Sequence, residues 1–334
     1  MADARLAWWK SSAAKAALGW LVVLAIGAAI SPGFFELEWR EGRLYGTFVD
    51  VLLRASPTLL AALGMTLVIG TGGVDLSVGA VAAISAVLAA RHLQSGGNAA
   101  MALTLGLGSG ALLGAWNGVL VRKLGLVPIV ATLVLFTAGR GLAQLASGGN
   151  VLTFRSDTFA SLATGTLAGL PLPIWITLAS LAALTFVVRG TSFGLYLQAC
   201  GDNPRAADLA GLPVTAVIVS AYALCGLFAA LSGAIVAADV QAGDAASAGL
   251  YLELDAILAV VIGGTSLRGG RVQLVGTAFG ALILQTLTTL VLVQGARLEF
   301  ALIAKALAVV AVCALQSERW GELLRRRPRA GGAQ

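Results

Sequence analysis

An aspartate inside the apolar part of the chain is the first place where chemistry could occur. Asp75 lies two residues after a Thr-Gly-Gly break (71–73) that joins two apolar runs within residues 64–87. Non-helical backbone and a carboxylate are both unfavourable in hydrocarbon unless protein or water covers them. Asp75 could hydrogen-bond a polar solute, or it could cap the helix that follows, where the helix dipole favours negative charge. The break therefore predicts either a transport path or a helix cap.

Other polar side chains within the apolar runs extend this candidate path. Arg140 has Gln144 one turn later on the same predicted helix face. Each position also has a structural interpretation, because Asn117 can hydrogen-bond between helices and Arg140 can reach the outer interface. The candidate translocation path consists of Gly72, Gly73, Asp75, Ser77, Asn117, Arg140 and Gln144.

Two further groups of charges need an explanation. Lys305 lies about halfway along the last apolar run, so it needs a partner or a cavity. Asp239, Asp244, Glu253 and Asp255 surround one connection that we expect to be external. They could meet basic residues of a binding protein, or they could belong to a solvated loop.

The residues needed for catalysis or metal binding do not cluster. The only histidine, His92, has no acid, base or metal ligand nearby in the sequence. The three cysteines, Cys200, Cys225 and Cys313, are scattered without metal-ligand spacing and are expected to pack between helices. An intramembrane enzyme would need a nucleophile–base pair or clustered ligands. We therefore predict no catalytic residue, no metal site and no cofactor in this chain.

Composition indicates an all-α integral membrane protein. Of 334 residues, 58% are hydrophobic and 11% are charged, whereas soluble domains carry about 25% charged residues. About 20 apolar residues cross the hydrocarbon core, and this length predicts about ten transmembrane helices. The second and eighth run into glycine clusters and are candidates for broken helices. The ten predicted spans are 13–30, 56–71, 74–91, 99–121, 125–146, 172–188, 213–238, 252–267, 272–293 and 298–316.

The basic residues predict the orientation. With the N-terminus in the cytoplasm, five basic residues fall outside: Arg40, Arg43, Arg91, Arg155 and Arg297. Those that fall inside are Arg5, Lys10, Lys15, Arg122, Lys123, Arg189, Arg205, Arg268, Arg271, Arg319, Arg325, Arg326, Arg327 and Arg329. This bias follows the positive-inside rule, so the net charge of +6 reflects membrane orientation and not nucleic-acid binding.

The chain divides into three predicted segments. Residues 1–12 form a cytoplasmic N-terminal segment, and residues 13–316 form the transmembrane domain. Residues 317–334 form a basic cytoplasmic tail that could contact anionic lipid. Both ends are therefore expected in the cytoplasm.

The longest cytoplasmic connection, 189–213, contains a predicted short helix. Asn203 can cap it, Pro204 suits its first position, and Gly211 ends it. The small residues between them would allow close packing against another surface. This connection is either a passive linker or a docking helix for a cytoplasmic partner.

Several motifs together resemble one protein family. The segments GDNPRAADLAGL, GMTLVIGTGGVDLSVGA, AWNGVLV and ELDAILAVVIGGTSLRGGR are similar to signatures of the monosaccharide permeases of bacterial ATP-binding-cassette (ABC) importers, the ribose/xylose/arabinose/galactofuranose group. Within this group, GRLYGTFVDVLLRASP, AGRGLAQL and IVAADVQAGDAASAGLYLELDAI most resemble a galactofuranose permease. The likeness covers residues 40 to 316, which is nearly the whole chain.

The resemblance implies a permease fold of the ribose-permease type in the bacterial inner membrane. It also implies three protein partners: a cytoplasmic ATPase that binds ATP and Mg²⁺, a second and non-identical permease subunit, and a periplasmic sugar-binding protein. The chain itself has no GxxxxGK[ST] phosphate-binding loop. By the same resemblance, the residues that couple to the ATPase are Gly201, Asp202, Asn203, Pro204, Arg205, Ala206, Ala207, Leu209 and Gly211.

The alternative function is a stand-alone secondary sugar transporter or channel. Such a protein would have no use for an ATPase docking helix, so the connection 189–213 favours the ABC importer.

Overall fold

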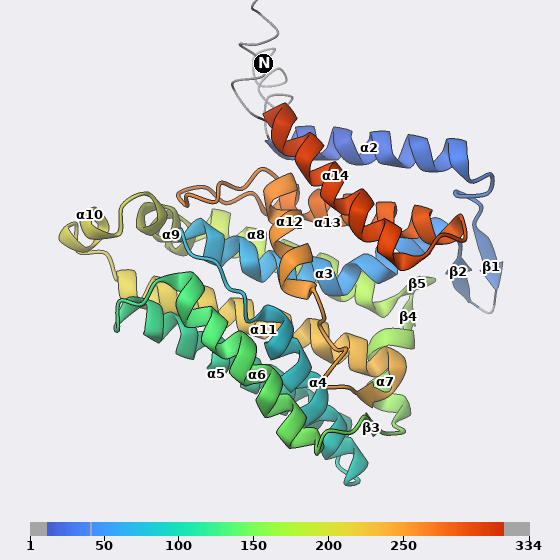
Figure 1. Cartoon of the computed structure of the whole chain (residues 1–334), viewed down its shortest axis with the longest axis horizontal. Helices are drawn as coiled ribbons and strands as arrows, with labels where there is room; N and C mark the ends of the chain where they lie inside the picture. Colours follow the sequence, from blue (N-terminus) through green and yellow to red (C-terminus); the bar gives the residue numbers. More distant parts are fainter. Residues whose placement is uncertain (1–11, 41, 317–334) are drawn as a thin grey trace, which may run out of the picture.

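A computed structural model of the protein describes residues 12–40 and 42–316, and most of these residues are helical (Figure 1). The predicted tail 317–334 lies outside the described residues, as does the predicted N-terminal segment except for Ser12, the first residue of α2. Figure 1 shows most long helices side by side along one direction, with α10 at one end and the short strands at the other. We call these the α10 end and the β end.

Each of the ten predicted spans corresponds to a helix, but the helices do not confirm the number of spans. They are α2 (Ser12–Ile30), α3 (Thr47–Gly70), α4 (Val78–Gln94), α5 (Ala99–Arg122), α6 (Pro128–Ser147), α8 (Leu172–Gly190), α11 (Val214–Val240), α12 (Leu252–Ile262), α13 (Leu274–Val293) and α14 (Leu298–Gln316). Within the described ranges, seven of these are long and apolar enough to cross a membrane: α2, α3, α5, α6, α8, α11 and α13. α4 has 17 residues and α12 only 11.

The two candidates for broken helices have different outcomes. The prediction for the second span is wrong, because α3 is one continuous helix of 24 residues that begins at Thr47 and passes through Pro57. Its glycine cluster forms the exit turn, where Gly72 has a φ of +82°, and does not interrupt the helix. In the eighth span, α12 ends at Gly263 and is about 16 Å long at 1.5 Å per residue. That is about half of the hydrocarbon thickness.

Short elements that the sequence did not predict close the β end. β1 (Glu38–Arg40) pairs with β2 (Arg43–Tyr45), β3 (Leu152–Thr153) with β6 (Ala242–Gly243), and β4 (Thr166–Leu167) with β5 (Leu170–Pro171), all antiparallel. The helix α7 (Asp157–Thr164) lies beside them (Figure 1). The strands have only two or three residues each, so the fold remains helical.

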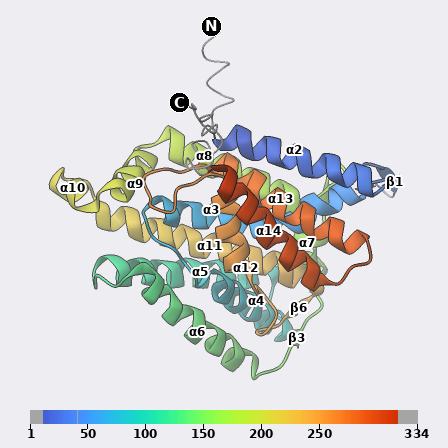
Figure 2. The same ribbon diagram turned by 45° about the horizontal axis from the view of Figure 1, so that its top comes forward.

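The core forms around α3, whose residues from Leu59 to Gly70 are all buried. α11 lies between α3 and α5 in both views (Figures 1 and 2). Glycines let α5 approach α11 closely: a Cβ at Gly114 would collide with the carbonyl oxygen of Tyr222, and one at Gly118 would lie 2.7 Å from the Cα of Val219. Helices in membranes commonly associate through such small residues.

This contact gives a test of the fold. Gly114→Val should destabilise the protein by roughly 1–3 kcal/mol, because the added methyl groups force α5 away from α11. Gly108→Val on the same helix is the matched control, because nothing lies within 4 Å of its Cβ position. Thermal unfolding in detergent measures both. Equal melting temperatures for the two variants would contradict the packing of α5 on α11.

Candidate functional site

The break between α3 and α4 contains a buried polar cluster. The Oδ1 atom of Asp75 accepts hydrogen bonds from the backbone N of Ser77 at 2.9 Å and from its Oγ at 2.6 Å. Asn117 on α5 donates from Nδ2 to Ser77 Oγ at 2.9 Å, which confirms the predicted hydrogen bond between helices. All three residues are at most 1% exposed. Apart from Asn117 Oδ1, which has no hydrogen-bond partner among the described residues, the polar side chains of the cluster bind one another.

Asp75 makes a cap-type hydrogen bond, as the sequence suggested, but two residues ahead of the assigned N-cap of α4. Ser77 occupies the N-cap position, and Asp75 binds the backbone N–H of Ser77, which precedes the helix. A second carboxylate, that of Glu253, lies against the first turn of α4: the residue is 6% exposed, and a Cβ at Gly79 would collide with its Oε2 atom. Glu253 comes from α12, far along the chain, so its negative charge reaches this helix N-terminus only through the fold.

A small cavity borders the break on the side of the α10 end. It has a volume of about 350 Å³ and is lined by Gly72, Gly73, Tyr222 and Pro204, among others. Among the described residues, the Tyr222 hydroxyl has no hydrogen-bond partner. Gly73 packs closely on that hydroxyl, 2.5 Å from where its Cβ would lie. The predicted path residues Gly72 and Gly73 therefore border a cavity, and the Asp75 cluster is buried behind them.

The connection from α11 to α12, residues 241–251, enters the helix bundle. Gly243 packs on α4 near Ala90, and Gly249 packs near Gly79. These two contacts are about 16 Å apart along α4 at 1.5 Å per residue. The connection thus runs from the β end towards the middle of the molecule, where α12 begins and crosses the direction of the long helices (Figure 1).

Arg140 of α6 binds this entering loop. Its Nη1 atom donates hydrogen bonds to the carbonyl oxygens of Ala248 at 2.7 Å, Ala245 at 3.1 Å and Ala246 at 3.4 Å. Non-helical backbone at membrane depth requires such partners. Arg140 therefore holds the loop, a role that the sequence did not predict. Gln144, one turn further along α6, is exposed.

The four acidic residues that the sequence grouped together do not share one environment. Asp239 is exposed, whereas Glu253 is buried against α4. Asp244 accepts hydrogen bonds from its own loop. Asp255 on α12 forms an ion pair with Lys305 on α14, with 2.7 Å between Oδ2 and Nζ. Asp255 is thus the partner of Lys305, which the sequence predicted to need a partner or a cavity.

At the α10 end, the predicted short helix is present. α9 (Ser192–Asp202) and α10 (Pro204–Leu209) are joined by Asn203, whose Oδ1 atom accepts hydrogen bonds from the backbone N of Arg205 and Ala206. The predicted cap and the first-position proline are both confirmed.

The faces of α10 differ in burial. Ala207 is 5% exposed and packs inward, whereas Leu209 is 91% exposed and Ala206 and Arg205 also face outward. Gly211 follows with a φ of +79°. Asp208 forms an ion pair with Arg122 at the end of α5. α10 therefore projects from the bundle (Figure 1), and it exposes Leu209 together with charged side chains.

Glycines from three segments meet beneath α10, and we call this contact the glycine junction: Gly70, Gly72, Gly201, Gly269 and Gly270. The backbone N of Gly270 donates to the carbonyl of Gly70 at 3.0 Å. A Cβ at Gly201 would collide with both of these groups. Asp202 lies against Gly270. The end of α9 thus touches the α3–α4 break and the loop after α12 at one point.

The role of Arg140 leads to a prediction. In Arg140→Met the loop carbonyls lose a charged donor, and hydrogen bonds of this kind contribute about 1.5–3 kcal/mol. We expect the loop to open more often, so that a cysteine at the buried position Ala248 (A248C) reacts with maleimide roughly tenfold faster or more. Arg91→Met is the control, since Arg91 donates to a carbonyl on the exposed surface. Unchanged labelling in the Arg140 variant would show that the loop does not depend on this side chain.

Comparison with known proteins places the chain in a family. Residues 47–314 match the family model described as branched-chain amino acid transport system / permease component. The chain is 45% identical to the galactofuranose transporter permease protein YtfT of Escherichia coli, over 91% of this chain and 89% of that protein. It is 36% identical to the ribose import permease protein RbsC of Escherichia coli, over 89% and 91% of the two chains. The fructose import permease protein FruF of Bifidobacterium longum is 33% identical, over 90% and 86%. The chain therefore belongs to the family of transport-system permease components, and it is a multi-pass membrane permease rather than an enzyme.

Proposed function

We propose that this chain is the membrane-spanning permease subunit of a bacterial ABC importer for a monosaccharide, galactofuranose or a related sugar. A separate ATPase drives the import. The chain is 45% identical to a galactofuranose permease over 91% of its length, and this similarity supports the substrate class. The single observation that carries the mechanism is the capped and exposed helix α10, whose neighbour α9 ends in the glycine junction.

The charges favour a cytoplasmic location for the α10 end. Basic residues gather at the helix ends and connections of this end, and the positive-inside rule assigns such a basic side to the cytoplasm. They are Arg122, Lys123, Arg189, Arg205 and Arg268. α2 begins at the same end, because Ser12 touches Gly264 in the loop after α12. This arrangement agrees with cytoplasmic chain ends and leaves the β end facing the periplasm and a sugar-binding protein.

The coupling step follows from the packing beneath α10. An ATPase bound to α10 would move α9 together with α10, because only Asn203 separates the two helices. At the glycine junction, the backbone of Gly201 touches the backbone of Gly70 and Gly270 directly. A displacement of Gly201 would therefore reach the α3–α4 break and the loop after α12 together, as in a rigid-body switch between two access states.

The sugar path lies between this chain and a second permease. The buried cluster of Asp75, Ser77 and Asn117 shapes the break from inside the subunit, whereas Arg140 and Gln144 lie at or near the surface. The second permease, which the resemblance suggests is non-identical, would complete the path on that surface. ATP and Mg²⁺ would bind to the ATPase alone.

A stand-alone secondary transporter or channel is the alternative function. It would translocate sugar without nucleotide, and α10 would be only a connector. The capped and projecting helix α10 argues against this, since a self-sufficient carrier would have no use for a docking helix whose neighbour ends in the glycine junction.

The exposed tip of α10 gives the first functional test. Leu209→Asp should leave folding unchanged, because Leu209 is 91% exposed, but it should reduce co-purification of the ATPase and sugar uptake at least tenfold. Leu167→Asp, at an exposed leucine of the β end, is the matched control. Normal uptake in Leu209→Asp would refute docking through α10. Sugar accumulation by the wild-type subunit alone, without nucleotide, would favour the secondary transporter.

The glycine junction gives a second test with a different readout. Gly201→Ala places a methyl group against the carbonyl of Gly70, so we expect ATP hydrolysis to continue while sugar uptake falls several-fold. Gly190→Ala, at the same end, is the control because only ordinary van der Waals contact with Phe186 surrounds its Cβ position. Parallel loss of hydrolysis and uptake in Gly201→Ala would indicate impaired assembly rather than impaired transmission.

A further inference from the structure

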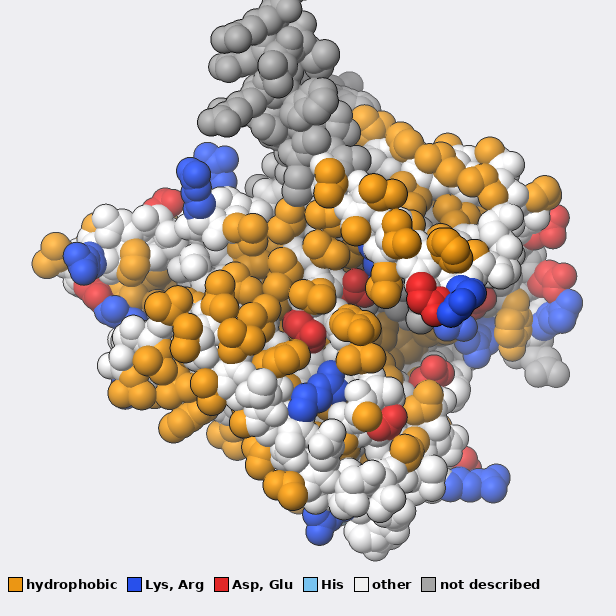
Figure 3. All heavy atoms as spheres, in the orientation of Figure 1, with side chains coloured by type: hydrophobic (Ala, Val, Ile, Leu, Met, Phe, Trp, Pro, Cys, Tyr) orange, Lys and Arg blue, Asp and Glu red, His pale blue; other side chains and the backbone are white. Residues whose placement is uncertain are grey.

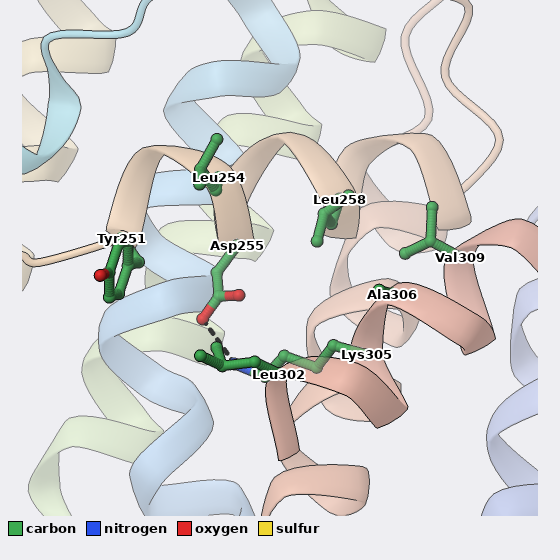
Figure 4. Close-up of a pocket in the computed structure, with 8 residues that line it drawn as sticks. All are labelled: Tyr251, Leu254, Asp255, Leu258, Leu302, Lys305, Ala306 and Val309. Atoms are coloured by element: carbon green, nitrogen blue, oxygen red, sulfur yellow. Dashed lines mark hydrogen bonds and ion pairs between the residues drawn. The ribbon is translucent and has the colours of Figure 1, made fainter. Parts of the chain in front are cut away.

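A pocket between α12 and α14 has a charged floor (Figure 4). Its volume is about 480 Å³, within the range of about 300–1,000 Å³ found for small-molecule sites. Figure 4 shows the carboxylate of Asp255 directed towards Lys305, with Tyr251 at one end of the pocket. Leu254, Leu258 and Leu302 supply most of the remaining wall.

The ion pair does not fit a pocket that faces lipid. Asp255 and Lys305 have side chains that are 22% and 12% exposed, so both ions are largely removed from water and yet open to the pocket. Charged groups within a membrane usually face the protein interior or a water-filled cavity. The face drawn in Figure 3 also carries several other acidic and basic side chains around this region. The partly exposed ion pair therefore offers polar contacts in a pocket whose other walls are mostly apolar.

Tyr251 adds an aromatic side chain in an unusual conformation. Its φ of +61° lies in the left-handed region that favours glycine, and its side chain is 52% exposed. Strained non-glycine residues of this kind concentrate at functional sites. Because Tyr251 precedes the first turn of α12, this conformation places its ring beside the mouth of the pocket (Figure 4).

The position of the pocket also fits a transported solute. α12 begins about midway between the α10 end and the β end, after the loop that Arg140 holds. Binding sites near the middle of the membrane commonly use short helices of this kind. Asp255 lies in the first turn of α12, so its carboxylate stands close to the end of that short helix.

We propose that Asp255, Lys305 and Tyr251 form a monosaccharide-binding subsite on the translocation path. The carboxylate accepts hydrogen bonds from sugar hydroxyl groups, and the ammonium donates to hydroxyl oxygens. The tyrosine ring and the leucines cover the C–H faces of the sugar. This subsite deepens the proposed function and rests on it, and it places recognition in the membrane subunit as well as in the binding protein.

The first experiment uses the whole transporter, reconstituted in vesicles with its ATPase, second permease and binding protein. Uptake of radiolabelled galactose, which supplies both ring forms, is measured together with ATP hydrolysis. Asp255→Asn and Tyr251→Gly should each lower uptake at least tenfold, with hydrolysis within twofold of the wild type. Glycine tolerates the positive φ at position 251, so this variant removes the ring without straining the backbone.

A charge exchange separates recognition from a purely structural ion pair. The double variant Asp255→Lys with Lys305→Asp keeps a pair but reverses the hydrogen-bonding pattern, so uptake should stay low. Restored uptake would show that the pair only joins α12 to α14, and it would overturn the proposal. The control exchanges Arg297 and Glu299, an exposed pair near the start of α14, and should leave uptake unchanged.

Labelling tests whether the pocket is open to water. Leu302→Cys, at a wall position that is 46% exposed, should react with a membrane-impermeant maleimide, and galactose should slow this reaction. No reaction at any stage of the ATP cycle would mean that lipid or the second permease fills the pocket, and the proposal would fail. If the wild-type transporter imports no sugar, the proposed function fails. If it imports sugar and the pocket variants match it, only the subsite fails.

Discussion

The structure depends on one constraint: backbone that leaves the helical state inside a membrane must find its hydrogen-bond partners within the protein. The loop 241–251 meets this constraint through Arg140, whose guanidinium binds three of its carbonyls. The α3–α4 break meets it through Asp75 and through the hydrogen bond from Gly270 to Gly70. Except for the local hydrogen bonds between Asp75 and Ser77, these contacts join parts of the chain that are far apart in the sequence. The irregular segments are therefore fixed by tertiary contacts rather than by local propensity.

Local signals explain why the short helix in the connection 189–213 could be predicted from the sequence. The cap at Asn203, the proline after it and the glycine at 211 each act within a few residues, and the structure places all three as expected. The hydrogen bond of Asn117 was also predicted, because an amide in an apolar run has few alternatives. The family and the approximate positions of the long helices followed from motifs and hydropathy.

Long-range contacts explain what the sequence did not predict. The acidic residues near 239–255 were interpreted as one external group, because nothing in the sequence shows that the connection turns into the bundle. In the structure, Glu253 lies against α4. Asp255 forms an ion pair with Lys305, which is 50 residues later in the sequence. The glycine pattern on α5 was available as a signal of close helix packing, but its partner on α11 could not be deduced from spacing. The break after Gly70 was located correctly but interpreted as an interruption of a span, although it is the end of a continuous helix.

The exposed leucine at the tip of α10 has a consequence for the life of the protein in the cell. If the α10 end faces the cytoplasm and binds a partner, as proposed, a subunit synthesised in excess of its partners would present Leu209 to the cytosol with nothing to cover it. Exposed apolar patches are liabilities for aggregation, and they attract chaperones and proteases. The surface that fits this subunit for assembly would thus also mark an orphan copy for removal, which would tie its abundance to that of the partner that covers it.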